Sequence, residues 1–210
     1  MLNCTNSVIA QVVVINSTNY DSLLNVNASY QLVALKSDFI REEIKYATAD
    51  NFTKKIVYDT AAVYLSVDAR NAILKVLEQL KPLNVGLVIY DAYRPYRYTV
   101  KFWEIIHDDR YVADPKKGSR HNRGCAVDVG LFDLKTGKQL EMPTAYDDFS
   151  ENAWVNAKNR TKIQIKNVEL LQNAMTCNGF QLFETEWWHF DYTGWQKHPI
   201  IDVSFQELNK

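Results

Sequence analysis

The sequence lacks the long apolar run that a membrane-spanning helix requires, which is roughly twenty residues. Its most apolar stretch near the start covers residues 8–15, but no basic residues precede it and no small-residue cleavage site follows it. Both features mark a secretory signal, so we expect none in the sequence as it stands. We therefore expect a soluble protein, cytoplasmic as written and periplasmic if a signal peptide has been removed.

An excess of charge of one sign is also missing, because 24 basic side chains are balanced by 25 acidic ones. A nucleic-acid-binding surface needs a concentrated basic stripe, and the sequence has none. We therefore expect no nucleic-acid partner. Nothing in the pattern indicates an oligomeric state.

Cysteine is scarce, and Cys4, Cys125 and Cys177 are widely spaced, without a Cys-x-x-Cys pair. Such a set predicts neither a disulfide framework nor a cysteine-rich zinc site. Glycine and proline are few as well, at 7 and 5 residues, and no repeat, low-complexity tract or linker interrupts the 210 residues. A chain of this size and uniformity predicts one domain.

What is present is an interspersed series of helical and strand patterns. Helices are predicted over residues 96–107 and 164–177, and after Ser66, which can cap a helix whose inward positions are Ile73, Val76, Leu77 and Leu80. Strands are predicted at residues 86–90, 125–132 and 180–192. Because no β-α-β rhythm repeats, we predict an α+β fold, with an antiparallel sheet flanked by helices.

The first residues differ from the rest in composition, being rich in Asn, Ser and β-branched residues. They predict an arm of irregular structure with short strands. We place this arm at residues 1–40, as part of the same domain, and the main body at residues 41–210.

The stretch from Ser119 to Asp128 is the first that carries chemistry. In a strand from Cys125 onward, Cys125 and Val127 face one side, while Asp128 faces the other between two residues that have almost no side chain. This leaves open space above the carboxylate. His121 precedes a turn that Gly124 permits, so it can fold back over the same face.

The second such stretch runs from Glu184 to Asp191 and contains Glu186, Trp187, Trp188 and His189. In a regular strand, Glu186 and His189 point to opposite faces because they are three residues apart. They converge only if Glu186 lies in a bend that opens the strand. The two tryptophans can then wall off the site from bulk water.

Together these residues predict a catalytic zinc site. Two imidazoles and one carboxylate, from His121, His189 and Asp128, leave a fourth position for water. A carboxylate that is not a ligand, Glu186, can take the proton of that water as the water attacks a carbonyl. Arg94 follows a buried strand and is the predicted cation for the oxyanion.

Each residue also has a structural interpretation. His121 could be a hydrogen-bonded loop residue, Asp128 a turn-anchoring acid, Glu186 a solvated strand start, and Arg94 a partner of Asp91. We expect Cys125 to pack in the core rather than act as a nucleophile, and both tryptophans to be buried. His107 and His198 belong to no cluster and are predicted to lie at the surface.

The combined pattern resembles the zinc D,D-peptidases that act on bacterial cell-wall peptides. The matching residues are Ser119-x-His121-x-x-Gly124-x-Ala126-x-Asp128 and Glu186-x-Trp188-His189. Within that group the chain is similar to the D-alanyl-D-alanine dipeptidases, through residues 45–53, 90–95, 146–150 and 186–190. The resemblance implies the fold of that family, which is hedgehog-like, with one zinc ion per chain and residues 41–210 as the catalytic domain.

The resemblance also implies a substrate. The chain is expected to hydrolyse D-Ala-D-Ala, with Ser119 and Asp147 holding the free amino group and Tyr46 lining the pocket. Asp148 is the alternative to Asp147. A carboxylate that faces the substrate ammonium would reject longer peptides, whose amide nitrogen is uncharged. The short connection between Arg94 and His121 leaves strict selectivity for dipeptides open.

Two other functions are compatible with the same residues. One is a D,D-carboxypeptidase that trims longer wall peptides, against which Asp147 argues. The other is a zinc-binding module without turnover, against which Glu186 and Arg94 argue. The physiological role, whether depletion of a wall precursor or recycling of D-alanine, is not decided by the sequence.

Overall fold

The computed structural model describes residues 12–209, so the part of the predicted arm over residues 1–11 lies outside the described residues. A five-stranded sheet runs through the middle of the molecule, with strand order β3-β5-β6-β8-β7. The strands are β3 (Ile40–Glu42), β5 (Val85–Asp91), β6 (Ala126–Asp133), β7 (Phe180–Phe183) and β8 (Glu186–Tyr192).

The predicted α+β class is confirmed, but the sheet is not purely antiparallel. The pairs β5–β6, β6–β8 and β7–β8 are antiparallel, whereas β3 runs parallel to β5. Residues 43–84 separate these two strands, and a connection of that length allows the chain to return in the same direction.

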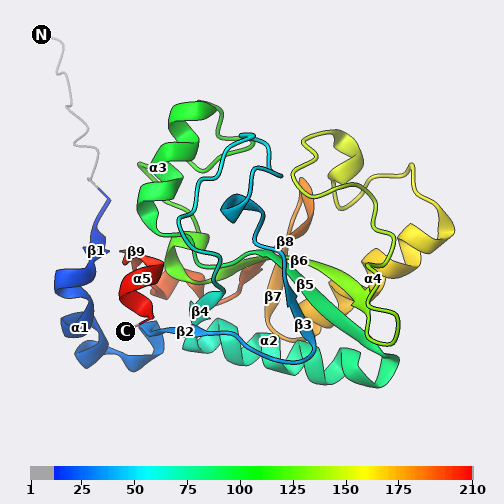
Figure 1. Cartoon of the computed structure of the whole chain (residues 1–210), viewed down its shortest axis with the longest axis horizontal. Helices are drawn as coiled ribbons and strands as arrows, with labels where there is room; N and C mark the ends of the chain where they lie inside the picture. Colours follow the sequence, from blue (N-terminus) through cyan, green and yellow to red (C-terminus); the bar gives the residue numbers. More distant parts are fainter. Residues whose placement is uncertain (1–11, 210) are drawn as a thin grey trace, which may run out of the picture.

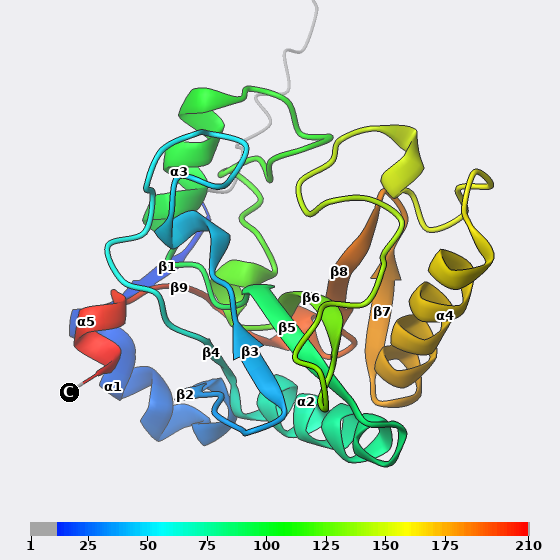
Figure 2. The same cartoon turned by 45° about the vertical axis from the view of Figure 1, so that its right-hand side comes forward.

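Two long helices lie against each other and pack on the sheet (Figures 1 and 2). The first, α2 (Val67–Leu80), begins where the Ser66 side chain accepts a hydrogen bond from the backbone of Ala69, and it buries all four predicted inward positions. The second, α4 (Lys162–Cys177), has a capping box made by Thr161 and Gln164. This cap explains why it begins two residues before its predicted start.

The remaining elements are shorter. Helix α3 (Tyr96–Ile105) matches the predicted helix over residues 96–107, and α5 (Phe205–Leu208) ends the described chain. Single 3₁₀ turns lie at Ala28–Tyr30, Lys45–Ala47, Lys81–Leu83, His121–Arg123, Glu151–Ala153 and Trp195–Lys197. No helix among the described residues is long and apolar enough to cross a membrane.

The predicted arm needs a correction. Its short strands exist, as β1 (Val14–Asn16), parallel to β9 (Ile200–Asp202), and β2 (Leu32–Ala34), antiparallel to β4 (Tyr64–Ser66). However, residues 17–26 are not irregular, because they form helix α1 (Ser17–Val26). With β1, β9 and α5 this helix lies at the end of the molecule away from α4 (Figures 1 and 2).

Tertiary contacts explain why α1 forms from residues of low helix propensity. The Asn16 side chain caps the helix by accepting from the Asn19 backbone at 3.2 Å. Tyr20 is buried, and its hydroxyl accepts a hydrogen bond from the Leu32 backbone at 2.6 Å. This packing overrides a composition that favours irregular structure.

Candidate active site

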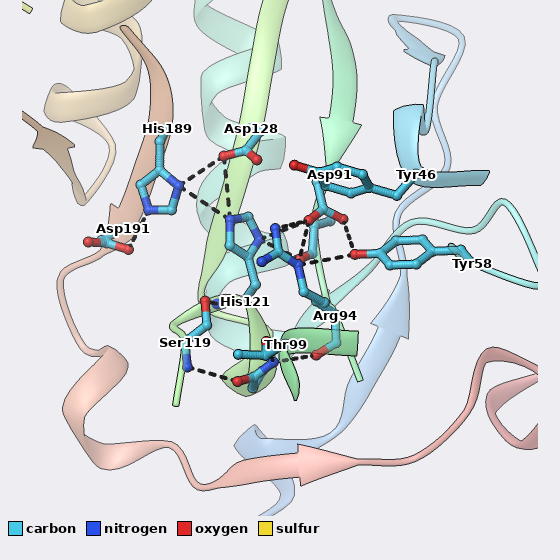
Figure 3. A network of polar contacts seen from close by, with 12 residues as sticks. Tyr46, Tyr58, Asp91, Arg94, Thr99, Ser119, His121, Asp128, His189 and Asp191 are labelled. Atoms are coloured by element: carbon cyan, nitrogen blue, oxygen red, sulfur yellow. Dashed lines mark hydrogen bonds and ion pairs between the residues drawn. The ribbon is translucent and has the colours of Figure 1, made fainter. Parts of the chain in front are cut away.

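Three buried side chains from three elements meet beside β6 and β8, two of the inner strands of the sheet (Figure 3). Asp128 on β6 and His189 on β8 are directly paired in the antiparallel register. His121 comes from the 3₁₀ turn His121–Arg123, which ends at Gly124 with a φ of 62°. A Cβ atom on Gly124 would lie 2.5 Å from Leu32 Cδ2 and 2.7 Å from the Ser66 nitrogen, so glycine is required here.

The distances between the three side chains fit one metal ion. His189 Nδ1 is 2.9 Å from Asp128 Oδ1, and His121 Nε2 is 3.3 Å from His189 Nδ1 and 3.4 Å from Asp128 Oδ1. Ligands at about 2.0 Å from a tetrahedral zinc ion lie about 3.3 Å apart. Two nitrogens and one oxygen at this spacing are a suitable donor set for a divalent transition metal.

The outer atoms of the same side chains are held by further hydrogen bonds. His121 Nδ1 donates to the Ala92 carbonyl at 2.6 Å, which leaves the lone pair on Nε2. His189 Nε2 pairs with Asp191 Oδ1 at 2.9 Å, which leaves the lone pair on Nδ1. Asp128 Oδ2 accepts from the Tyr146 hydroxyl at 2.9 Å. Such partners fix the orientation of metal ligands.

The charges of the three side chains depend on one another. Burial lowers the pKa of His189, but Asp191 and Asp128 outweigh it and hold that pKa well above its usual value, so a metal ion that binds here displaces a proton from His189. Burial raises the pKa of Asp128, but the neighbouring His121 and His189 outweigh it and hold that pKa far below its usual range. Asp128 is therefore ionised across the physiological pH range, as a metal ligand must be.

Glu186 lies beside the triad without belonging to it. It opens β8 at an irregularity, since Leu182 pairs with Phe190 whereas the next residue, Phe183, pairs with Glu186. This is the predicted bend, and it brings Glu186 Oε2 to 3.8 Å from His189 Nδ1. Burial raises the pKa of Glu186 to about 7, against the opposing effect of His189.

Arg94 is buried and lines the same cavity, but it is also the partner of Asp91. Its Nη2 lies 2.7 Å from Asp91 Oδ2, and its Nε is 3.2 Å from the Tyr58 hydroxyl (Figure 3). The guanidinium lies over the rings of Phe102 and Tyr46. The hydrogen bonds found among residues 12–209 use Nε and Nη2 and leave Nη1 without a partner, so the N–H groups of Nη1 stay available.

The three predicted substrate-binding residues line the cavity, whose volume is about 120 Å³. Ser119 and Tyr46 are buried, and the Tyr46 hydroxyl donates to Asp147 Oδ1 at 3.1 Å. Asp147 Oδ2 is buried without a hydrogen-bond partner, and the residue has a φ of 61°. Burial and the nearby Asp128 raise the pKa of Asp147 to about 8. Asp148 does not line this cavity, and its carboxylate accepts from the Ser150 backbone.

The surroundings of the site agree with the predictions only in part. Both tryptophans are buried, but only Trp188 lines the cavity, because the Trp187 indole donates to Thr144. Cys125 packs in the core as expected. The prediction of a surface position is confirmed for His107 and wrong for His198.

His198 is 3% exposed, with Nε2 at 3.5 Å from Asp68 and its ring edge-on to Tyr30. The contacts come from the N-terminal segment and from the start of α2, which no local pattern around His198 indicates.

Several supporting residues were not predicted. Asp191 had a usable signal, because it lies two residues after His189 and therefore on the same face of β8. Tyr146 lies next to Asp147 in the stretch 146–150 that resembles the dipeptidases, but its role as a partner of Asp128 was not predicted. Tyr58 had no signal, since a loop brings it to the site from a distant part of the chain.

A buried three-ligand metal site with a free carboxylate beside it, on an α+β fold, is the arrangement of a metallopeptidase. The sequence model of the peptidase family M15, described as D-Ala-D-Ala dipeptidase, matches residues 29–207. The chain belongs to this family.

Individual relatives carry the same description. A D-alanyl-D-alanine dipeptidase of Escherichia coli is 36% identical over 163 residues, which cover 78% of this chain and 84% of the relative. One of Enterococcus faecium is 29% identical, covering 72% of this chain and 85% of the relative. Among solved structures, VanYB in complex with D-alanine-D-alanine has a TM-score of 0.43 at 12% identity, covering 66% of this chain and 77% of that one.

Proposed function

We propose that this protein is a zinc-dependent dipeptidase that hydrolyses D-Ala-D-Ala to two molecules of D-alanine. The observation that carries the proposal is the triad of ligand atoms 2.9 to 3.4 Å apart with Glu186 beside it, in a small cavity. Membership of the dipeptidase family supports the choice of substrate.

His121, Asp128 and His189 would hold the zinc ion. When bound, zinc polarises a carbonyl oxygen and lowers the pKa of a coordinated water towards about 7. The buried carboxylate of Asp128 and two imidazoles, with His189 losing its proton on metal binding, would supply the ligand set that this chemistry needs.

Glu186 is the proposed general base. Its raised pKa, about 7, lets it accept a proton from the attacking water at neutral pH and return that proton to the leaving amine. A carboxylate that metal coordination has not neutralised is needed for this transfer. Glu186 lines the cavity and lies 3.8 Å from the inward nitrogen of His189, whereas Asp191 is hydrogen-bonded to the outer nitrogen of that ring.

Arg94 is the proposed stabiliser of the oxyanion. Asp91 and Tyr58 fix its guanidinium, so that no reorganisation is needed when negative charge develops on the carbonyl oxygen. Its contact with Asp91 therefore supports this role, because the contact sets the orientation of the cation.

Asp147, with Ser119 and Tyr46, is the proposed site for the free amino group. The unpartnered Oδ2 of Asp147 is a buried acceptor that lacks a donor, and a substrate ammonium would supply one. The nitrogen of a longer peptide is an uncharged amide at this place. Burial raises the pKa of Asp147 to about 8 in the free protein, and the substrate ammonium would favour the ionised carboxylate, which a longer peptide with an uncharged nitrogen would not.

The experiment compares D-Ala-D-Ala with N-acetyl-D-Ala-D-Ala on protein of measured zinc content, with and without a chelator. We expect about one zinc ion per chain, hydrolysis of the free dipeptide, loss of activity on chelation, and poor cleavage of the acetylated compound. Equal rates for the two compounds would reject the dipeptidase in favour of a carboxypeptidase. Bound zinc without turnover of either compound would indicate a binding module.

A further inference from the structure

Two tyrosine hydroxyls connect the metal-ligand carboxylate to the carboxylate proposed for the amino group. The Tyr146 hydroxyl lies 2.9 Å from Asp128 Oδ2 and 3.1 Å from the Tyr46 hydroxyl. The Tyr46 hydroxyl in turn lies 3.1 Å from Asp147 Oδ1. The three contacts connect the four side chains in series beside the cavity.

The number of protons in this series of contacts fixes its direction. A carboxylate oxygen accepts, so the Tyr146 hydroxyl donates its single proton to Asp128 Oδ2 at 2.9 Å. The Tyr46 hydroxyl donates its own proton to Asp147 Oδ1 at 3.1 Å, so Tyr46 does not compete with Tyr146 for Asp128.

Packing sets the position of the Tyr146 ring independently of these hydrogen bonds. The ring stacks on Tyr90, with centroids 4.9 Å apart, and meets the edge of Trp188 at 5.4 Å. The hydroxyl is therefore presented to Asp128 by a rigid aromatic cluster. A donor that is held in place without the metal costs little to organise when the metal binds.

We propose that Tyr146 is a positioning residue for the metal site. By occupying Oδ2 of Asp128, its hydroxyl leaves Oδ1 alone to face His121 and His189. Removing the hydroxyl leaves a buried carboxylate oxygen without a donor and frees the carboxylate to rotate. The proposal rests on the proposed function, because it needs His121, Asp128 and His189 to bind a metal ion.

The test is the zinc affinity of Tyr146→Phe, measured by competition with a chromophoric chelator. The phenylalanine ring keeps both aromatic contacts, so the fold is expected to persist. We expect zinc to bind about tenfold more weakly, as is typical when an outer-shell partner of a ligand is lost. The rescue variant carries 4-aminophenylalanine at position 146, and its N–H can donate to Asp128. This variant should bind zinc with an affinity close to that of the wild type.

Tyr98→Phe is the matched control. The Tyr98 hydroxyl also donates to a carboxylate, Asp59 Oδ1 at 3.0 Å, and its ring is also buried among aromatic side chains, but Asp59 is no metal ligand. This variant loses the same kind of hydrogen bond and is expected to keep wild-type zinc affinity.

The outcomes separate the two proposals. A wild-type protein that binds no zinc overturns the proposed function, and the role of Tyr146 with it. If the wild type binds zinc and Tyr146→Phe binds it equally well, only the role of Tyr146 is overturned. Should the phenylalanine variant fail to fold, the 4-aminophenylalanine variant decides, and a tenfold loss of zinc affinity in that protein overturns the proposal.

Discussion

Glu186 combines two properties that rarely occur together in one carboxylate. It is largely withdrawn from water, which raises its pKa to about 7, yet it lies 3.8 Å from Nδ1 of His189, a proposed metal ligand, without a hydrogen bond to it. A carboxylate that coordinated the metal ion itself would not be free to exchange protons. The gap at Glu186 therefore supports its proposed role as a general base.

Glu186→Gln should separate metal binding from turnover. The amide keeps the shape of the side chain but cannot accept the proton of the attacking water, so kcat is expected to fall by about 10²- to 10⁴-fold. Zinc content, measured by metal analysis after dialysis, should stay at the wild-type value. A variant that hydrolyses the dipeptide at the normal rate would show that another group is the base.

Asp147→Asn should change selectivity more than catalysis. The variant loses the charge that faces the substrate ammonium, so the KM for D-Ala-D-Ala is expected to rise by about tenfold or more. The rate with N-acetyl-D-Ala-D-Ala should change much less, because that substrate has no ammonium to lose. Asp148→Asn is the control, since Asp148 does not line the cavity. If Asp148→Asn raised the KM for D-Ala-D-Ala more than Asp147→Asn did, Asp148 and not Asp147 would be the residue that holds the amino group.

At the scale of elements, the sequence predicts most accurately where a local pattern decides the structure. The helix after Ser66 follows from its cap and its apolar spacing, and the strand that carries Asp128 follows from alternation. The spacing of Glu186 and His189 predicts a bend at Glu186. It does not predict that the bend arises from an irregular pairing with β7 between Leu182 and Phe183. Helix α1 was missed because its stability comes from Tyr20 and from partners distant in sequence.

Gly124 belongs to this scale because it joins the turn of His121 to the strand of Asp128. Gly124→Ala forces a Cβ atom against Leu32 and the Ser66 backbone at a positive φ. We expect a loss of unfolding free energy of about 1–3 kcal/mol and a weaker metal site. Urea unfolding and zinc titration measure the two effects.

Gly137→Ala is the control for this substitution. Gly137 also has a positive φ, 67°, but nothing lies within 4 Å of the position of its Cβ atom. The loss of unfolding free energy in Gly137→Ala therefore measures the cost of the positive φ alone. Equal losses at both glycines would show that the close contacts at Gly124 are unimportant.

At the scale of the whole molecule, the sequence predicts the ligands better than it predicts their support. His121, Asp128 and His189 lie in two short stretches with recognisable spacing, and the structure brings them together with Glu186. The residues that hold them come from loops whose pattern does not indicate this role, as Tyr58 and Tyr146 do. Tertiary structure alone decides which of many tyrosines reaches the site, so a single sequence does not indicate them.

The site also affects the stability of the whole metal-free protein. The pKa of Glu186 is about 7 in the folded state against an ordinary value of 4.5. Between these two values the folded state binds more protons at Glu186 than the unfolded state does, so the contribution of Glu186 to stability falls as pH rises from 4.5 to 7 and is constant above it. Asp147, whose pKa is raised to about 8, contributes a separate fall that continues to that pH and that the wild type and a variant of Glu186 share. The folded protein therefore carries the cost of a buried carboxylate at neutral pH.

Glu186→Gln removes that cost, because the amide does not ionise. The quantity to compare is the difference in unfolding free energy between the variant and the wild type, measured in the presence of a chelator. This difference should favour the variant by about 3 kcal/mol more at pH 8 than at pH 4, because one pKa unit corresponds to 1.36 kcal/mol. Urea unfolding of both proteins at several pH values between 4 and 8 measures this. A stability difference that stays constant over the range would mean that Glu186 is not desolvated in the folded protein, and that its proton affinity is not raised for catalysis.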